Sequence, residues 1–402
     1  MSNELNRDEL FTRIRSAREK HKTPDLSKTI LRDMDLTGQD LLGVNLQQAK
    51  LQGCNLSRVN LQGANLQGAN LEALNLQKAD LRGADLQGAI LLGANLQAAQ
   101  LSGCKLQKAN LQNANLHDAD LEKANLQKAT LQGALLHNTN LGGANLEGLD
   151  LHHLDLTTTY LQGANLIGAN LAGVELSGLD LSHTPLQGAD LENAILQNAN
   201  LKGANLTNIS TFLSKQVTKL NGADFSGSNM SGIQLREADL HVVTLTGVDL
   251  SQADLEAADL RGVELQGVNL QEANLQQANL REANLQNAAL QRANLQTGML
   301  QGANLQGADL EQAILQGSDL QAANLQEANL AGSDLQNTKL QAVSLLSSNL
   351  QGADLQGADL RGADLGQADL RGTCLKAATY NAETRWPEGF KAKLVSGLKK
   401  TS

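Results

Sequence analysis

The sequence predicts an all-β solenoid, a coil of short extended segments wound around a narrow aliphatic core. Three observations predict it: leucine recurs with a five-residue period, turn-forming residues recur with the same period, and aromatic residues make up only 2% of the chain. A globular core in a chain of 402 residues would use more large side chains than this. Because the chain is periodic, its length does not imply several independent domains.

The leucine period defines the repeat. Leucine recurs at every fifth position from Leu31 to Leu206, with the register broken at 207–219, and again from Leu220, with Phe225 and Met230 replacing it, to Leu375. The residue two before leucine is usually Ala, and the residue one before is Asn or Asp. This period matches neither the apolar stripe of an α-helix nor the simple alternation of a strand.

The repeat predicts which side chains are buried. Residues two apart in an extended segment share a face, so Leu and the Ala-position residue point inward while Asn, Asp and Gln point outward. Gly, Asn and Asp favour tight turns, so a turn in each repeat winds the chain into a coil. We therefore expect Leu126→Asp to disrupt the solenoid and Gln127→Asp to have little effect.

The pattern A-(N/D)-L-x-x, seen in ANLQG, ADLRG and ANLEA, resembles the pentapeptide-repeat family over about 350 residues. The resemblance implies a right-handed quadrilateral β-helix with four repeats, or about twenty residues, in each coil. The first block would then form about nine coils and the second about eight. The segment YNAETRWPEGF resembles the closing tail of cyanobacterial members of this family.

The domain organisation follows from where the repeat starts, breaks and stops. We expect an amphipathic helix over 3–21, with Pro24 marking the exit from the helix, and a C-terminal segment with helical spacing of apolar residues. The apolar residues concerned are Leu5, Leu10, Phe11 and Ile14 near the N-terminus, and Phe390, Leu394 and Leu398 near the C-terminus. The predicted regions are an N-terminal capping helix and linker (1–25), a first β-helix block (26–206), a register break (207–219), a second block (220–375) and a C-terminal cap with a short helix (376–402).

The register break at 207–219 leaves two alternatives. Leu206 and Leu220 are 14 residues apart, one short of three repeats or nine more than one repeat. The segment is either a bulge that offsets two stacks or a loop that protrudes and contacts a partner, as loops on rigid scaffolds often do. For the second alternative the candidate contact residues are Phe212, Leu213, Lys215 and Lys219.

Charge and cysteine content exclude several classes of protein. The formal net charge is −10, and residues 31–375 alone carry −16, which argues against direct binding to nucleic acid or to an anionic membrane. Cys54, Cys104 and Cys374 are too far apart in sequence for a disulfide framework or an ordinary zinc site. The N-terminus shows no signal peptide and no apolar run is long enough to insert into a membrane, so we expect a cytoplasmic protein.

The sequence contains no catalytic motif and no phosphate-binding loop, so we expect no enzyme activity and no cofactor. His117 and His137 are twenty residues apart and would stack on successive coils, where they are either surface histidines or a pair that shares a metal ion. Glutamines spaced by twenty should form hydrogen-bonded columns of side-chain amides, as in stacked β assemblies. The columns expected are Gln47, Gln67, Gln87, Gln107 and Gln127, and Gln276, Gln296, Gln316, Gln336 and Gln356.

Three functions follow from these features. The first is a non-enzymatic structural or adaptor solenoid that binds a protein partner along its surface, either as a monomer or as a dimer through the C-terminal tail. The second is DNA mimicry toward a type II topoisomerase, by resemblance to the quinolone-resistance members. Against it, −16 over about 80 Å is only about a third of the charge density of DNA. The third is a small-ligand or metal binder.

Overall fold

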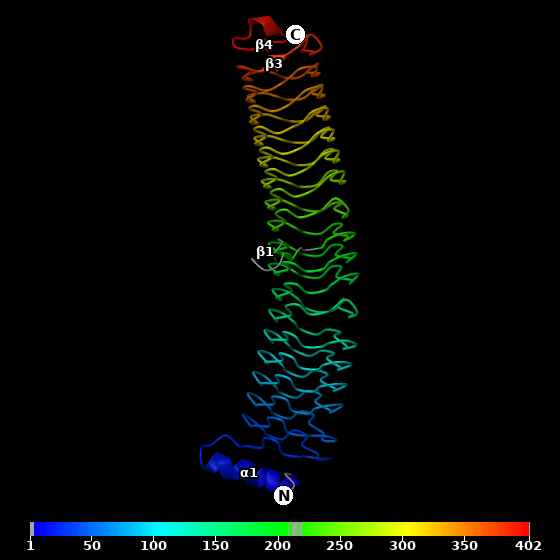
Figure 1. Cartoon of the computed structure of the whole chain (residues 1–402), viewed down its shortest axis with the longest axis vertical. Helices are drawn as coiled ribbons and strands as arrows, with labels where there is room; N and C mark the ends of the chain where they lie inside the picture. Colours follow the sequence, from blue (N-terminus) through cyan, green and yellow to red (C-terminus); the bar gives the residue numbers. More distant parts are fainter. Residues whose placement is uncertain (1–3, 208, 211–214, 217–218, 402) are drawn as a thin grey trace. The chain divides into compact units, whose positions relative to one another are not determined.

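The computed structural model describes residues 4–207, 209–210, 215–216 and 219–401. The chain forms two compact units, Met1–Ala194 (unit 1) and Ile195–Ser402 (unit 2). Each unit is a stack of coils in which short extended segments alternate with turns (Figure 1). The prediction of a β-helix solenoid is therefore confirmed for each unit.

Backbone hydrogen bonds join each coil to the next in parallel register. Asp25 bridges Asn45, Asn45 bridges Asn65, and in unit 2 Asp249 bridges Asn269. At Asn65 the N–H donates to Val44 O at 3.0 Å and the C=O accepts from Leu46 N at 2.7 Å. The bridged residues are twenty apart, so one coil takes four repeats.

Nearly every described repeat contains a type II turn that starts at its leucine; His153, Thr158 and Val242 stand at this turn position without a positive φ. Leu46 O accepts from Ala49 N at 2.9 Å, and Gln48, two after the leucine, has a φ of 55°. A type II turn requires a positive φ at this position, which explains why Gly is frequent there. The preceding Asn45 stabilises the same turn, because its Oδ1 accepts from Gln47 N at 3.2 Å.

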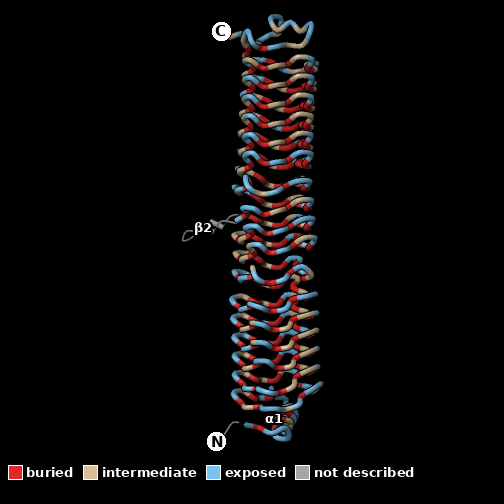
Figure 2. The backbone as a smooth tube through the Cα atoms, turned by 90° about the vertical axis from the view of Figure 1, so that its right-hand side faces the viewer, coloured by how far each residue is buried: buried red, intermediate tan, exposed pale blue. Residues whose placement is uncertain are grey.

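The core of each unit consists of the leucines and the residues at the Ala position, as predicted. Leu126 is 1% exposed, and in Figure 2 buried positions recur along every coil. Cys54 and Cys104 occupy the Ala position and are buried, whereas Cys374 is exposed. Burial raises the pKa of the Cys104 thiol to about 12. Phe225 and Met230 replace leucine and are fully buried.

The N-terminal helix α1 (Arg7–Glu19) begins at a capping box, in which Glu9 N donates to Asn6 Oδ1 and Asn6 N donates to Glu9 Oε2. Leu10 and Ile14 are buried, whereas Phe11 is half-buried. Leu5, expected on this helix, precedes it and donates its N–H to Ile30 O at 3.1 Å. The helix is therefore shorter than predicted, because its N-terminal flank pairs with the first coil.

The C-terminal segment extends the last coil of unit 2 instead of forming a helix over 390–398. Strands β3 (Thr379–Tyr380) and β4 (Lys399–Lys400) pair in parallel, and only one turn of 3₁₀ helix, η1 (Ala392–Leu394), lies between them. Gly397, with a φ of 81°, turns the chain toward β4. The apolar residues have helical spacing, but the segment forms no helix there because β4 pairs with the backbone of the last coil.

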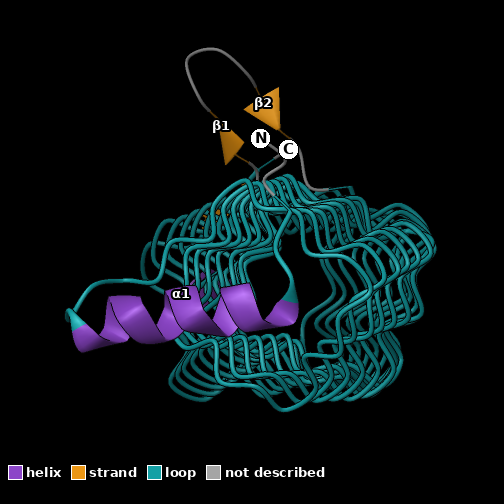
Figure 3. Ribbon diagram, turned by 90° about the horizontal axis from the view of Figure 1, so that it is seen from below, coloured by secondary structure: helices purple, strands orange, loops and turns teal. Residues whose placement is uncertain are grey.

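Unit 2 also contains a short antiparallel pair, β1 (Ile209–Ser210) and β2 (Lys215–Gln216), which projects from the coils (Figure 3). Among the described residues, no helix has both the length and the apolar composition that crossing a bilayer requires.

Candidate partner-binding surface

The interruption at 207–219 leaves the coil register of unit 2 intact. Residues before the interruption bridge residues after it: Ile195 bridges Asp224 and Asn205 bridges Gln234. Their spacing is 29 residues, where regular coils have twenty. The interruption therefore adds nine residues to one coil while the coils on either side remain hydrogen-bonded. This arrangement favours the protruding loop over a bulge that offsets two stacks.

The four candidate contact residues lie at or near this loop. Lys215 lies in β2, where it pairs with Ser210 of β1, and Lys219 is exposed where the chain re-enters the coil. Phe212 and Leu213 lie outside the described residues. We call the segment 207–219, which makes this coil nine residues longer, the excursion. The structure places Lys215 and Lys219 on the excursion, and whether they contact a partner stays a prediction.

The outward asparagines and aspartates form the columns that we expected of the glutamines. Asn304 Nδ2 donates to Asn284 Oδ1 at 3.1 Å, and Asn324 Nδ2 donates to Asn304 Oδ1 at 3.1 Å. The glutamine columns are discontinuous, since Gln47 Nε2 donates to Gln67 Oε1 but Gln67 Nε2 donates to Asp85 instead. Spacing alone could not reveal this, because the Asn side chain is short and already held by its turn.

Arginine neutralises aspartate at every D-L-R sequence. Arg82 binds Asp80 through Nε–Oδ1 at 2.9 Å and Nη2–Oδ2 at 2.6 Å, and three further pairs repeat this geometry. The hydrogen bonds from Arg82 lower the pKa of Asp80. The other pairs are Arg261 with Asp259, Arg361 with Asp359, and Arg371 with Asp369.

Unit 1 has a different irregularity: its backbone ladder opens. The Ala position holds leucine only at Leu74, Leu149, Leu154 and Leu179 in this block. Some bridges between successive coils are missing among the described residues of unit 1. Apart from the one at Pro185, which lacks an N–H, each missing bridge involves a residue that directly follows Leu149, Leu154 or Leu179. The bridges missing are Thr130–Asp150, Leu135–Asp155, Asp155–Glu175 and Tyr160–Asp180. Extra side-chain volume in a packed core forces backbone shifts, so these leucines increase the separation of the coils and break the bridges.

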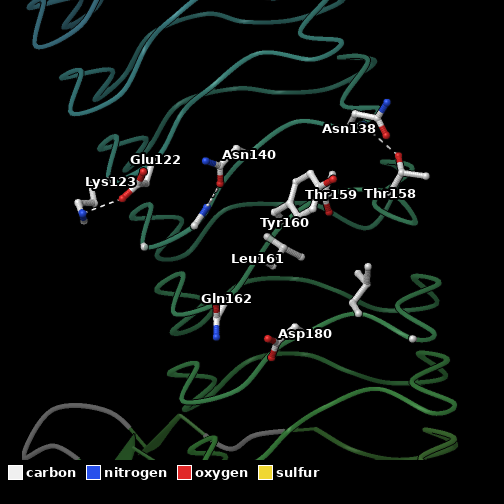
Figure 4. Close-up of a pocket in the computed structure, with 14 residues that line it drawn as sticks. Glu122, Lys123, Asn138, Asn140, Thr158, Thr159, Tyr160, Leu161, Gln162 and Asp180 are labelled. Atoms are coloured by element: carbon white, nitrogen blue, oxygen red, sulfur yellow. Dashed lines mark hydrogen bonds and ion pairs between the residues drawn. The ribbon is translucent and has the colours of Figure 1, made fainter.

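A groove of about 970 Å³ lies at one of these openings (Figure 4). Tyr160, Leu161 and Leu179 line it, and Tyr160 is 61% exposed in a chain with almost no aromatic residues. Glu122, which pairs with Lys123 at 2.7 Å, lines another part. The sequence signal for the groove was three leucines at the Ala position within 149–179, which sequence reasoning did not use.

Histidine side chains meet other polar groups in both units. His117 and His137 stack with ring centroids 5.6 Å apart, and His137 Nδ1 lies 3.0 Å from Thr158 Oγ1. In the described part of unit 2, Asp239, His241 and Asp259 place ligand atoms within 4.8 Å of one another. Arg261 already supplies a cation to Asp259 there.

An aromatic cluster lies at the C-terminal end of unit 2. Trp386 stacks on Phe390 at 4.8 Å between ring centroids and meets Tyr380 edge-on at 5.6 Å. Leu394 beside the cluster is 77% exposed, and Lys391, Lys393 and Lys400 line the same hollow. This is where the sequence concentrates aromatic residues, and the structure brings them together.

Fold and surface together define a repeat solenoid that carries loops and openings on a regular coil. The family model described as Pentapeptide repeats (8 copies) matches most of the chain, and the protein belongs to this family. The residues matched are 25–58, 54–93, 94–133, 124–163, 150–184, 186–208, 218–262, 258–296, 303–341 and 340–376.

Similar solved structures include three members of the family, and no curated protein matches the chain. HetL, involved in heterocyst differentiation regulation in the cyanobacterium Nostoc sp. strain PCC 7120, is 27% identical over 72% of this chain and 96% of its own, with a TM-score of 0.28. Rfr23 from the cyanobacterium Cyanothece 51142 is 31% identical over 32% of this chain and 90% of its own, with a TM-score of 0.23. QnrB1, a plasmid-mediated fluoroquinolone resistance protein, is 18% identical over 58% and 94%, with a TM-score of 0.22.

Proposed function

We propose that the protein is a non-enzymatic cytoplasmic adaptor whose coils hold binding segments in place for a protein partner. The observation that carries the proposal is the excursion in unit 2, around which the coil register continues from Ile195–Asp224 to Asn205–Gln234. A scaffold that keeps its register around an insertion presents that insertion without loss of its own backbone bonds. Lys215 and Lys219 are the two of our four candidate contact residues that the structure describes.

A deletion variant tests this proposal. Removing residues 209–217 joins Leu206 to Leu220 through the repeat LTNTK, which closely matches the natural repeat LQNTK at 335–339. The deletion therefore restores a regular coil, and it should remove the partner without unfolding the solenoid. Tagged wild-type and deleted chains would be compared by pull-down from the native host with quantitative mass spectrometry. A partner set identical for both chains counts against the excursion, and no enriched protein for either counts against the adaptor function.

The right-handed, four-sided winding and the capping of both ends belong to the same proposal. The contacts of α1 support an N-terminal cap, since Leu10 and Ile14 are buried and Arg18 Nη1 pairs with Asp40 Oδ2 at 3.0 Å. Uncovered coil ends offer unpaired backbone groups to other chains. A chain that begins at residue 24 should therefore associate with itself, and sedimentation would show whether its mass rises with concentration.

DNA mimicry remains the alternative, and the described surface gives it little support. Arginine binds aspartate at four D-L-R sequences, so part of the acidic surface is neutralised in place. A gyrase supercoiling assay with a quinolone tests it: unchanged inhibition in the presence of this protein removes the alternative. Zinc calorimetry tests metal binding at His117 and His137, and the absence of heat removes the metal-binding function.

A further inference from the structure

We infer that the groove at Tyr160 in unit 1 is a strand-addition site for a short extended segment of a partner protein. The inference rests on the proposed adaptor function and names a second place where that function acts. Its basis is the backbone that the open ladder leaves unpaired, the apolar side chains beside it and the room between the two coils.

The unpaired backbone groups have the spacing of a strand edge. Leu161 N–H, Gly163 N–H and Thr159 C=O have no hydrogen-bond partner among the described residues. One coil earlier the equivalent donors are satisfied, because Leu141 N donates to Tyr160 O at 2.8 Å and Gly143 N donates to Gln162 O at 3.0 Å. Backbone N–H and C=O groups next to a buried core require partners, so the open edge favours a chain that supplies them.

The geometry of the regular ladder shows how a segment would pair. At Tyr160 the N–H donates to Thr139 O at 3.0 Å on the closed side. On the open side a residue of the incoming segment would donate its N–H to Thr159 O and accept from Leu161 N, as each coil does with the next. The five-residue repeat turns after a few residues, so only about three residues of the segment pair in this way.

The side chains at the groove select an apolar residue in that segment. Tyr160 is 61% exposed, and the largely buried Leu161 and Leu179 line the same groove. Exposed aromatic residues beside a pocket are frequent anchors of protein interfaces. The groove holds about 970 Å³, enough for several side chains of an extended segment.

Hydrogen exchange of the intact chain tests the open edge first. The amides of Leu161 and Gly163 should exchange at least about tenfold faster than those of Leu141 and Gly143, their bonded counterparts one coil earlier. Equal protection of all four amides would show that the coils close in solution and would overturn the inference.

Binding is tested with a displayed library of random 12-residue peptides. The triple variant Leu149→Ala/Leu154→Ala/Leu179→Ala restores the usual Ala position and should close the ladder. Leu74→Ala is the matched control, because Leu74 occupies the same position in coils whose bridges are intact. A selected peptide should bind wild type and Leu74→Ala alike, bind the triple variant at least about tenfold more weakly, and slow exchange at Leu161 and Gly163.

Further measurements separate strand addition from peptide binding without backbone pairing and from binding of a second copy of the chain. N-methylation of the peptide amide that pairs with Thr159 O should weaken binding at least about tenfold, and a peptide indifferent to methylation at every amide in turn would overturn the inference. If the triple variant does not fold, Tyr160→Asn, which restores the usual residue of the repeat, takes its place and should weaken binding. A concentration-dependent mass of the wild type that the groove variants abolish would assign the groove to a second copy of this chain and overturn the inference.

Failure of this site is distinguishable from failure of the adaptor function. If no peptide is selected while a host partner is lost on deletion of 209–217, the adaptor function stands and the groove is not its site. If peptides bind as expected while that deletion changes no partner, the groove stands and the excursion is not the contact.

Discussion

At the residue scale, the position two after each leucine shapes the coil, because nearly every described repeat has a positive φ there. Gly88 has a φ of 64° with open space around its Cβ position, whereas Ala98 occupies the same turn position with a φ of 55°. Only backbone conformation distinguishes these two sites from an ordinary surface position.

Gly88→Ala should therefore destabilise the protein by about 1 kcal/mol through backbone strain alone, since a Cβ meets no atom there. Ala98→Gly should show no such loss, because relief of strain offsets the extra freedom of glycine in the unfolded chain. Urea unfolding of both variants measures the difference. A loss of stability in Ala98→Gly equal to that in Gly88→Ala would contradict the strain argument.

Thiol reactivity should separate the three cysteines. Burial raises the pKa of Cys104 to about 12 and also raises the pKa of Cys54, while Cys374 is exposed. Since the thiolate is the reactive form, a maleimide at pH 8 should label Cys374 alone in the folded protein. Mass spectrometry should find one label in the folded chain and three in denaturant. Rapid labelling of Cys104 in the folded chain would show that the Ala position is not sealed.

At the element scale, the inward and outward assignment has a direct mutational test. Leu126 is 1% exposed, so Leu126→Asp buries a carboxylate in the core and should lower stability by several kcal/mol. Gln127 is half-buried and its Nε2 donates to Glu147 Oε2 at 2.8 Å, so Gln127→Asp should reduce stability only slightly. Thermal melting compares the two variants, and equal shifts would refute the assignment.

The sequence predicted features that are determined within each repeat, but not features that depend on contacts with neighbouring coils. The inward leucines and the buried Cys54 and Cys104 followed from periodicity, because each repeat has the same surroundings. The twenty-residue coil followed from the family resemblance. The C-terminal helix did not, because Leu394 and Leu398 have helical spacing but β4 can pair with the open edge of the last coil.

The opening of the ladder was equally hidden. Leu74 and Leu154 occupy the same position of the repeat, yet the coils around Leu74 remain bridged. Around Leu154 the neighbouring Leu149 and Leu179 add volume within the same few coils, so the effect depends on their number. Periodicity identifies the position of a residue but not how much extra volume the coils accept there.

At the scale of the whole molecule, stability should fall in acid because many aspartates are bonded in the folded state. Hydrogen bonds from arginine lower the pKa of Asp80, Asp259 and Asp359 below the ordinary value of 3.8. A lowered pKa in the folded state contributes stability that is present above pH 3.8 and is lost as the pH falls through the folded value. The melting temperature should thus change little from pH 7 to about pH 5 and decline below about pH 4.

A variant with Arg82, Arg261 and Arg361 replaced by Gln provides the control. Without their arginine partners these aspartates should have a folded pKa closer to 3.8, so the variant should be less stable at pH 7 and should lose less stability as the pH falls. Circular dichroism melts across this pH range would measure both chains. Coincident profiles would mean that these pairs contribute nothing measurable, as exposed pairs often do.

The uninterrupted pairing on both sides of the nine extra residues has a practical consequence for engineering. Since Asn205 meets Gln234 across the excursion with the same kind of bridge that regular coils form, the length of the excursion is independent of the pitch of the coil. A protein designer could exchange the excursion for an epitope tag or a foreign recognition sequence, and the scaffold would display it without redesign of its core.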